Sequence, residues 1–321
     1  MEMILTPDAK EFIDEWRDSR PHVVAHTSGS TGTPKEIRLL KSDMRASAKA
    51  TLQFFGICEN STLYLPLSPD YIAGKMQIVR ALEAGCNLIV EEPSNRPALT
   101  LPPTISEISL LPIVPSQVDA VLASPFRSTI KAMIIGGAPL APEAELEVLK
   151  DGIPAYATYG MTETCSHVAL RRLGNDCFDA LPGFTFSLDE RGCLSIKSET
   201  LSFHELITND IVELHSPTKF RWLGRYDNVI NSGGIKIFPE EIEKLITPLI
   251  DNTIRLYVTS RPSERWGEEA VIVTDSTRLP ADLLDRVREL TGPKRAPKAI
   301  ITVPQIELTR SQKIIRRKIS D

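Results

Sequence analysis

The sequence predicts an α/β fold followed by a smaller α+β part, and three observations support this. Short apolar segments typical of buried strands alternate with helical patterns in the first half of the chain, as at 133–135 and 141–149. After residue 183, alternating apolar and polar residues such as those at 193–196 predict antiparallel strands. Beyond Asp227, a proline-led acidic helix at 239–245 lies among short strands.

The other expected elements are justified by periodicity and by end signals. Helices are expected where apolar residues recur at helical spacing, with Ser42 as one N-cap and Gly85 as one C-terminal stop. In chain order we expect a helix at 8–19, a strand at 23–25, a helix at 42–55, a strand at 61–67, a helix at 73–84, strands at 86–90, 153–157 and 211–214, strands at 256–259 and 270–273, and a helix at 281–290.

Length and composition narrow the class of protein. A chain of 321 residues is long enough for two domains, which we expect at 1–226 and 227–321. A hydrophobic content of 42% and a charged content of 25% are typical of a globular protein. The net charge of −5 argues against a general nucleic-acid-binding protein, which usually has a basic face.

Cysteine usage and hydropathy indicate the compartment. The five cysteines form no C-x-x-C pair, so neither a structural zinc nor a disulfide framework is expected. The first residues lack the basic region of a signal peptide, and no apolar stretch approaches the ~20 residues of a membrane helix. We therefore expect a cytoplasmic protein that does not bind membranes. The sequence leaves homo-oligomer formation open.

The segment 26–35, His-Thr-Ser-Gly-Ser-Thr-Gly-Thr-Pro-Lys, follows an apolar strand and has little side-chain bulk. Hydroxyl groups, backbone N–H groups and an ammonium in such a loop can approach a polyphosphate closely. A solvated turn has a similar composition. The spacing of Gly29, Gly32 and Lys35 fits neither a Walker loop nor a dinucleotide fingerprint, so a nucleotide here would be bound by another fold.

Four further motifs follow in order. They are Gly-Gly-Ala-Pro at 136–139, Tyr-Gly-Met-Thr-Glu-Thr at 159–164, Gly-Arg-Tyr-Asp-Asn at 224–228 with Ser-Gly-Gly-Ile-Lys at 232–236, and Leu-Thr-Arg-Ser-Gln-Lys at 308–313. Together with the loop, this set resembles the adenylate-forming superfamily of acyl-CoA synthetases, adenylation domains and luciferases. The resemblance implies a large domain of mixed sheets with flanking helices, here with a shortened N-terminal region, and a small mobile C-terminal α+β domain.

Within the superfamily, the chain is most similar to the o-succinylbenzoate–CoA ligases of menaquinone biosynthesis. The stretches that resemble them are 70–76 with Arg80, 152–164, and Arg-Trp-Gly at 265–267. The implied reaction uses ATP, Mg²⁺ and coenzyme A. The acid's carboxylate attacks the α-phosphorus, pyrophosphate leaves, and the thiol then displaces AMP. Two alternatives stay open: a CoA ligase for another aromatic or short acid, and a non-catalytic nucleotide-binding descendant.

The resemblance implies a role for each nucleotide-binding residue. The loop would bind the β- and γ-phosphates, 136–139 would lie flat against adenine, Tyr159 would stack on it, and Asp210 and Arg225 would bind ribose or phosphate. Asn209 departs from the family's usual glycine. The implied nucleotide set is Thr27, Ser28, Gly29, Ser30, Thr31, Gly32, Lys35, Gly136, Gly137, Ala138, Pro139, Tyr159, Gly160, Asp210 and Arg225.

The catalytic and hinge residues follow from the same comparison. Thr162 would contact phosphate and Glu163 would hold Mg²⁺, which prefers carboxylate oxygen. Without the motif, Glu163 is equally well interpreted as an acid at a helix N-terminus. Lys313 would approach the α-phosphate, although Gln312 replaces the usual glycine. Asp227 would be the hinge. The implied coenzyme A loop comprises Ser232, Gly233, Gly234 and Lys236.

The acid pocket is expected near a predicted helix. o-Succinylbenzoate has a second carboxylate that needs a cation, and both Lys75 and Arg80 are candidates. Five residues apart on a helix, they point in different directions. Arg80 matches the family better and Lys75 could instead be a solvated helix residue, but which of them holds the carboxylate stays open. Tyr71, Gly74 and His167 complete the expected pocket, although His167 could equally be a buried structural histidine.

Overall fold

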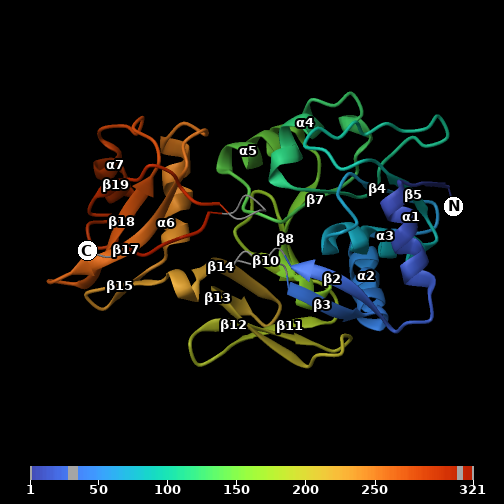
Figure 1. Ribbon diagram of the computed structural model, residues 1–321, viewed down its shortest axis with the longest axis horizontal. Helices are drawn as coiled ribbons and strands as arrows, with labels where there is room; N and C mark the ends of the chain where they lie inside the picture. The colour runs from blue at the N-terminus through green and yellow to red at the C-terminus, as the bar shows by residue number, and fades with distance from the viewer. Residues whose placement is uncertain (1, 28–34, 309–313, 320–321) are drawn as a thin grey trace.

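The computed structural model describes residues 2–27, 35–308 and 314–319, and these form three sheets and a separate hairpin. The molecule is elongated, with a larger body that contains the N-terminus and a smaller C-terminal part beside it (Figure 1). Helices and strands are mixed in both parts. The predicted α/β class is therefore confirmed.

A short parallel sheet occupies the N-terminal end of the larger body (Figure 1). Its strands, in spatial order, are β1 (Met3–Ile4), β5 (Asn87–Val90) and β4 (Thr62–Leu65). The helices of this region are α1 (Pro7–Arg17), α2 (Lys41–Phe55) and α3 (Ile72–Ala84). Helix α3 contacts α1, α2, β4 and β5, so it lies at the centre of this layer.

Helix α1 shows how local sequence produces a packed element. The Thr6 side chain accepts a hydrogen bond from the Ala9 N–H at 3.4 Å, and Pro7 occupies the first helical position. Phe12 and Trp16 lie one turn apart on the buried face. Burial of each such side chain contributes about 1.5–3 kcal/mol. Local capping therefore determines where α1 begins, whereas its apolar face determines how α1 packs against the rest of the protein.

A nine-stranded mixed sheet forms the centre of the larger body. Its first three strands are parallel and the others are antiparallel. In spatial order they are β6 (Leu111–Ile113), β7 (Met133–Ile135), β8 (Ala155–Met161), β9 (Ser166–Arg172), β10 (Phe178–Ala180), β14 (Lys219–Arg225), β13 (Glu205–Ser216), β12 (Cys193–Ser198) and β11 (Phe184–Leu188). Helices α4 (Val118–Leu122) and α5 (Pro142–Asp151) connect its parallel strands.

The hairpin of β2 (His22–Thr27) and β3 (Lys35–Leu40) holds the two ends of the glycine- and hydroxyl-rich loop. Its strands are antiparallel, and Thr27 pairs with Lys35. The loop residues Ser28, Gly29, Ser30, Thr31 and Gly32 lie outside the described part of the chain. For Thr27 and Lys35, only the backbone is described.

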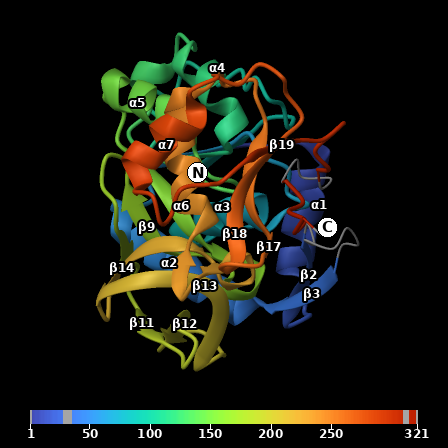
Figure 2. The same cartoon turned by 90° about the vertical axis from the view of Figure 1, so that its left-hand side faces the viewer.

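The C-terminal part has its own sheet and core, in which Ile242, Ile272 and Val287 are buried together. Its strands are β15 (Ile230–Ser232), β16 (Ile235–Ile237), β17 (Leu256–Ser263), β18 (Gly267–Thr274) and β19 (Ile300–Thr302). Helices α6 (Pro239–Ile246) and α7 (Leu283–Thr291) lie side by side against this sheet (Figure 2). Helix α6 also contacts β14, so it faces the larger body.

Most predicted elements are present, with ends that differ by a few residues. The expected Gly85 stop is confirmed, since this residue ends α3 with φ 63°. Ser42 as an N-cap is wrong: α2 begins at Lys41, whose backbone N–H donates to the Pro21 carbonyl and whose ammonium binds Asp18. The strand expected at 153–157 is displaced and continues to Met161.

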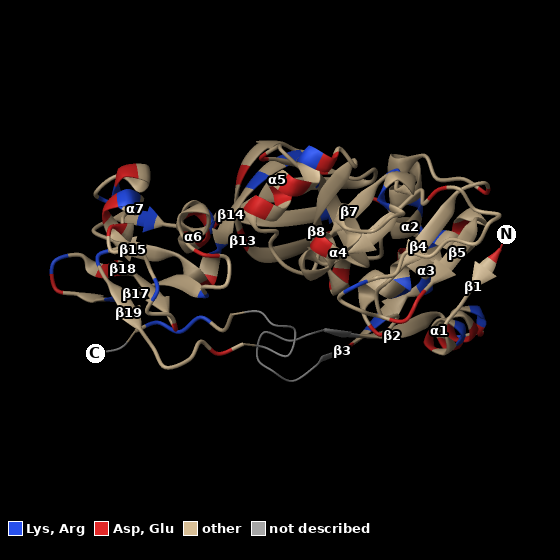
Figure 3. Cartoon of the chain, turned by 90° about the horizontal axis from the view of Figure 1, so that it is seen from above, with Lys and Arg blue, Asp and Glu red and all other residues tan. Residues whose placement is uncertain are grey.

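Two global features complete the fold. Within the described ranges, every helix is too short or too polar to cross a bilayer. Lysines and arginines are interspersed with acidic residues along the elements (Figure 3). The five cysteines are free thiols.

Candidate active site

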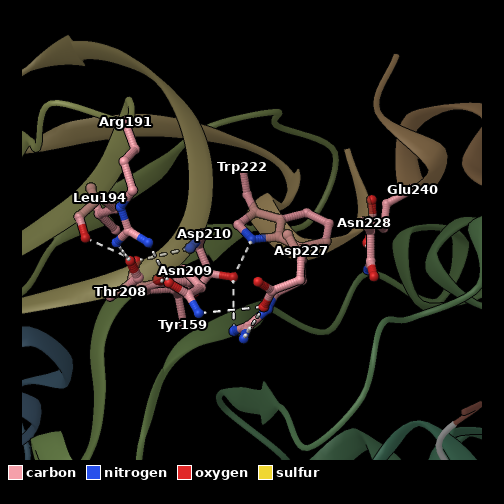
Figure 4. Close-up of polar contacts among 11 residues, drawn as sticks. Tyr159, Arg191, Leu194, Thr208, Asn209, Asp210, Trp222, Asp227, Asn228 and Glu240 are labelled. Carbon is pink, nitrogen blue, oxygen red and sulfur yellow. Dashed lines mark hydrogen bonds and ion pairs between the residues drawn. The ribbon is translucent and has the colours of Figure 1, made fainter. Parts of the chain in front are cut away.

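Three side-chain donors hold the carboxylate of Asp210, which is 6% exposed (Figure 4). Its Oδ2 accepts a hydrogen bond from the Tyr159 hydroxyl at 2.7 Å. Its Oδ1 accepts from the Trp222 indole at 3.3 Å and from the Arg225 guanidinium at 3.4 Å. Strands β8, β13 and β14 thus bring together one buried acid and three donors that are distant in the sequence.

The part of β13 just before this carboxylate is also braced by side chains. Arg191 donates to the Thr208 carbonyl at 3.1 Å and to Asn209 Oδ1 at 3.0 Å. The other end of the Asn209 amide donates to Asp227 Oδ2 at 3.3 Å. Figure 4 shows the chain of contacts from Arg191 to Asp227. The unusual asparagine therefore links the predicted ribose acid to the predicted hinge.

The region of the predicted hinge lies in the short helix η4 (Tyr226–Asn228), where the two parts of the molecule meet. The Arg225 side chain is 47% exposed, and its Nη2 lies 3.8 Å from Asp227 Oδ2. Asn228 donates to Glu240 of α6. A Cβ added at Gly224 would lie 2.4 Å from Glu240 Oε2, so a larger residue there would have to shift the Glu240 carboxylate.

Thr162 and Glu163 lie in the 3₁₀ turn η3 (Thr162–Thr164), which contacts β2 and β3. The Thr164 hydroxyl accepts from the Met161 N–H and lies 2.7 Å from the Ser166 carbonyl, which fixes the turn. Glu163 is exposed beside the hairpin that holds the loop. A single exposed carboxylate close to a phosphate loop is the kind of ligand that suits Mg²⁺, which uses one or two protein oxygens beside substrate phosphates.

Two of the predicted nucleotide glycines are required by close packing. A Cβ at Gly160 would lie 2.1 Å from the Ser166 carbonyl oxygen, and one at Gly136 would lie 2.3 Å from Thr158 Oγ1. Gly137 has φ 85°, which favours glycine. The segment Gly136, Gly137, Ala138 and Pro139 therefore follows β7 as a chain with little side-chain bulk, as a flat contact with adenine would need.

Tyr159 belongs to an aromatic cluster. Its ring meets Phe178 and Phe220 edge-to-face, with centroids 5.8 and 5.0 Å away. Burial, followed by the charge of Asp210, raises the pKa of the Tyr159 hydroxyl well above its usual value, so the hydroxyl remains a donor. The Tyr159 hydroxyl therefore has a role that the motif does not predict, as a hydrogen-bond donor to Asp210. Stacking of its ring on adenine stays a prediction.

Arg80 is a buried cation in α3, only 1% exposed. Its Nη1 donates to Gln77 Oε1 at 3.3 Å, but Nε and Nη2 have no hydrogen-bond partner among the described residues. Burial lowers its pKa to about 9, so the guanidinium is charged at neutral pH. A buried guanidinium with free donors is costly, and it suits a ligand that supplies a carboxylate.

Lys75 faces a different direction, toward α1. Its ammonium lies 4.4 Å from the centre of the Phe12 ring and 4.0 Å from Glu15 Oε2. Burial lowers its pKa, against the opposing effect of nearby acids. At the start of the same helix, Tyr71 is exposed, and a Cβ at Gly74 would lie 2.2 Å from the Ser68 carbonyl oxygen. Of the two candidates, Lys75 thus already has partners within the protein.

His167 lies in β9 and is 3% exposed. Its Nε2 is 3.1 Å from the Thr51 hydroxyl, and its Nδ1 is 3.5 Å from the Ser166 hydroxyl. Burial, followed by the positive charge of Arg80, holds the pKa of His167 well below its usual value. The histidine is therefore neutral, and its strand β9 contacts α3, the helix that carries Arg80.

The predicted coenzyme A loop connects β15 and β16. Ser232 is buried, whereas Gly233, Gly234 and Lys236 are exposed. Gly233 N–H donates to the Trp266 carbonyl at 2.8 Å. A Cβ on Gly233 would lie 2.5 Å from the Trp266 ring, so a larger residue would displace either the loop or the ring.

Lys313 lies outside the described residues, but the chain on both sides of its loop is described. Leu308 and Ile314 form an antiparallel bridge. Arg316 forms a half-buried ion pair with Glu243 of α6 and also donates to the Val258 carbonyl. The C-terminal segment is therefore fixed to the small sheet immediately after the predicted catalytic lysine.

Sequence reasoning missed several residues of this region. Trp222, Arg191 and Thr51 make contacts that join segments far apart in the chain. Arg316 follows the predicted catalytic lysine by three residues and is held by Glu243. None of these four has a local signal, because each acts through a partner that only the fold brings close.

Comparisons with known proteins support the fold. Residues 6–185 match the family model described as AMP-binding enzyme. The chain therefore belongs to the family of AMP-binding enzymes. It is 28% identical to 2-succinylbenzoate–CoA ligase of Listeria monocytogenes, over 98% of this chain and 73% of that protein.

Two solved structures illustrate the relationship. A protein from Dyadobacter fermentans, described as acyl-CoA synthetase (AMP-forming)/AMP-acid ligase II-like, is 31% identical with a TM-score of 0.64, over 96% of this chain and 91% of that one. O-succinylbenzoate coenzyme A synthetase from Bacillus subtilis, solved with ATP and magnesium ion, is 20% identical with a TM-score of 0.77, over 91% of this chain and 68% of that one. The fold is therefore the adenylate-forming one.

Proposed function

We propose that this protein is an AMP-forming acid–CoA ligase that converts o-succinylbenzoate to its CoA thioester. The observation on which the choice of acid depends is the buried Arg80, with two guanidinium nitrogens that lack partners among the described residues. A substrate with a second carboxylate would supply hydrogen-bond acceptors for these donors, whereas a monoacid would leave the donors without an acceptor. The resemblance to 2-succinylbenzoate–CoA ligases supports the same acid.

The alternative cation, Lys75, is less suitable. Its ammonium is already near Glu15 and over the Phe12 ring, and moving it into the acid pocket would remove both contacts. His167 lies in β9, which contacts α3, and because burial keeps it neutral it adds no second positive charge to this region. We therefore assign the non-reacting carboxylate to Arg80, with Tyr71, Gly74 and His167 as the surrounding wall.

In the first half-reaction, the acid's other carboxylate attacks the α-phosphorus of ATP and pyrophosphate leaves. The protein must hold two anions in line, which it does by binding ribose through Asp210 and Arg225 and phosphates through Thr162 and the loop of the β2–β3 hairpin. When bound, Mg²⁺ would neutralise phosphate charge, with Glu163 as its protein ligand. Lys313 would supply an ammonium near the reacting atoms.

In the second half-reaction, the coenzyme A thiol attacks the acyl carbonyl and AMP leaves. We propose that residues 227–321 rotate about Asp227, so that the loop of Ser232–Lys236 replaces Lys313 at the crevice. The separate core of the C-terminal sheet is what allows this part to move as a unit.

The test is release of pyrophosphate and AMP with a panel of acids. With o-succinylbenzoate, pyrophosphate release should need ATP and Mg²⁺, and sustained AMP release should need coenzyme A. Benzoate, anthranilate and indoleacetate should be at least about tenfold poorer substrates, because each lacks a second carboxylate for Arg80. Equal turnover of benzoate would contradict the assigned acid.

A pair of variants separates the two cations. Arg80→Met should lower kcat/KM for o-succinylbenzoate by roughly 10- to 100-fold, as expected for loss of a charged hydrogen-bonding group, and should change monoacid turnover by less than about threefold. Lys75→Met, the matched control on the same helix, should leave the ratio between diacid and monoacid unchanged. If Lys75→Met instead lowered turnover of the diacid selectively and Arg80→Met did not, Lys75 would be the residue that binds the second carboxylate.

A further inference from the structure

The Asp210 carboxylate has more partners than a simple ribose ligand needs. Each carboxylate has about four acceptor positions, and three are filled by Tyr159, Trp222 and Arg225. The three donors differ in how freely they can move. Arg225 is 47% exposed on a long side chain, and its 3.4 Å contact is the longest of the three.

Trp222 is the rigid donor. Its indole packs against the main hydrophobic cluster. Trp222 lies in β14, which pairs with β13, the strand that carries Asp210. The indole has one N–H and no acceptor, so its only polar contact within the described structure is with Asp210 Oδ1. Tyr159, which is also partly buried, donates to the opposite oxygen, Oδ2. Figure 4 shows the indole N–H directed at the carboxylate.

We propose that Trp222 is a positioning residue for the nucleotide: its N–H holds the Asp210 carboxylate in the orientation that receives the ribose hydroxyls. This inference rests on the proposed function, because it takes Asp210 as the ribose acid. Trp222 and Tyr159 keep the carboxylate plane fixed from both sides. Arg225 leaves Oδ1 when the nucleotide binds, and a ribose hydroxyl takes its place.

The variant Trp222→Phe removes the N–H and keeps an aromatic ring in the core. Calorimetric titration should show that ATP binds about five- to tenfold more weakly to this variant, since a hydrogen bond to a charged group is lost. With 2′,3′-dideoxy-ATP, which lacks both hydroxyls, the variant and the wild type should differ by less than about twofold. The control Trp16→Phe, a buried tryptophan in α1, should bind both nucleotides like the wild type.

Two outcomes would overturn the proposal. One is that Trp222→Phe binds ATP as tightly as the wild type. The other is that it loses equal affinity for ATP and the dideoxy analogue, which would indicate general damage. The variant Asp210→Asn distinguishes failure of this proposal from failure of the proposed function. If Asp210→Asn also binds ATP as tightly as the wild type, the assignment of Asp210 to ribose fails. If only Trp222→Phe keeps wild-type affinity for ATP, the positioning role of Trp222 alone fails.

A spectroscopic measurement does not depend on the stability of Trp222→Phe. The chain has three tryptophans, so ¹⁵N-indole spectra of the whole protein should contain three resolvable N–H signals. Asp210→Asn should shift the Trp222 signal, because its acceptor loses charge, and should leave the Trp16 signal unchanged. ATP should also shift it in the wild type. A Trp222 signal that responds to neither change would refute the proposal.

Discussion

The Asn209 amide donates to Asp227 Oδ2 at 3.3 Å and so joins the residue next to the proposed ribose acid to the proposed hinge. Arg191 holds the other end of the same amide. The proposed nucleotide site and the boundary between the two parts of the molecule are therefore connected by one side chain.

Asn209→Ala should loosen the hinge segment without disturbing adenylation. The hydrogen-exchange rates of amides in η4 should rise about two- to fivefold, as expected for loss of one exposed hydrogen bond, while pyrophosphate release changes less than about twofold. Asn231→Ala, an exposed asparagine in β15, is the control and should leave η4 unchanged. Unaltered exchange in the Asn209 variant would show that the contact does not hold the hinge.

Glu163→Gln should raise the Mg²⁺ requirement of adenylation. Because the amide has no negative charge, the Mg²⁺ concentration for half-maximal pyrophosphate release should increase by at least about tenfold. Glu147→Gln, an exposed residue of α5, should leave it unchanged. If both variants have the same Mg²⁺ dependence as the wild type, Glu163 is not the metal ligand.

His167 should make stability depend on pH. Burial holds its folded pKa well below the usual 6.5, so below pH 6.5 the unfolded chain binds a proton that the folded protein does not. Stability from this group is therefore complete above pH 6.5 and falls as the pH drops below it, by at most about 1.4 kcal/mol per pH unit. Urea unfolding of wild type and His167→Gln between pH 8 and 5 should show the two free energies converging at low pH. Parallel curves would mean that His167 is not held neutral.

The Arg316–Glu243 ion pair should stabilise the C-terminal part. Arg316→Met leaves a mostly buried carboxylate without its cation, which costs about 3–5 kcal/mol. Arg317, whose partner Glu307 is exposed, provides the matched control Arg317→Met, for which we expect no measurable change in the unfolding midpoint. If both variants lowered the free energy of unfolding in guanidinium by the same amount, burial of the Arg316–Glu243 pair would not increase its contribution to stability.

Much of the site could be anticipated from motifs because its residues are adjacent in the sequence. Thr162 and Glu163 directly follow strand β8, which ends at Met161, and Gly136 and Gly137 directly follow β7. Local patterns also predicted α3 and its Gly85 stop. The same patterns failed at Ser42, where a distant contact of Lys41 with Asp18 determined the start of α2.

The order of most strands and helices could be predicted from the sequence, because hydrophobic periodicity, turn residues and short motifs act over a few neighbouring positions. Only the tertiary structure decided that Arg80 rather than Lys75 lacks partners, and that Trp222 and Tyr159 share the carboxylate of Asp210. The physical reason is that burial and hydrogen bonding depend on side chains brought together from distant parts of the chain, and no local pattern records which of them meet.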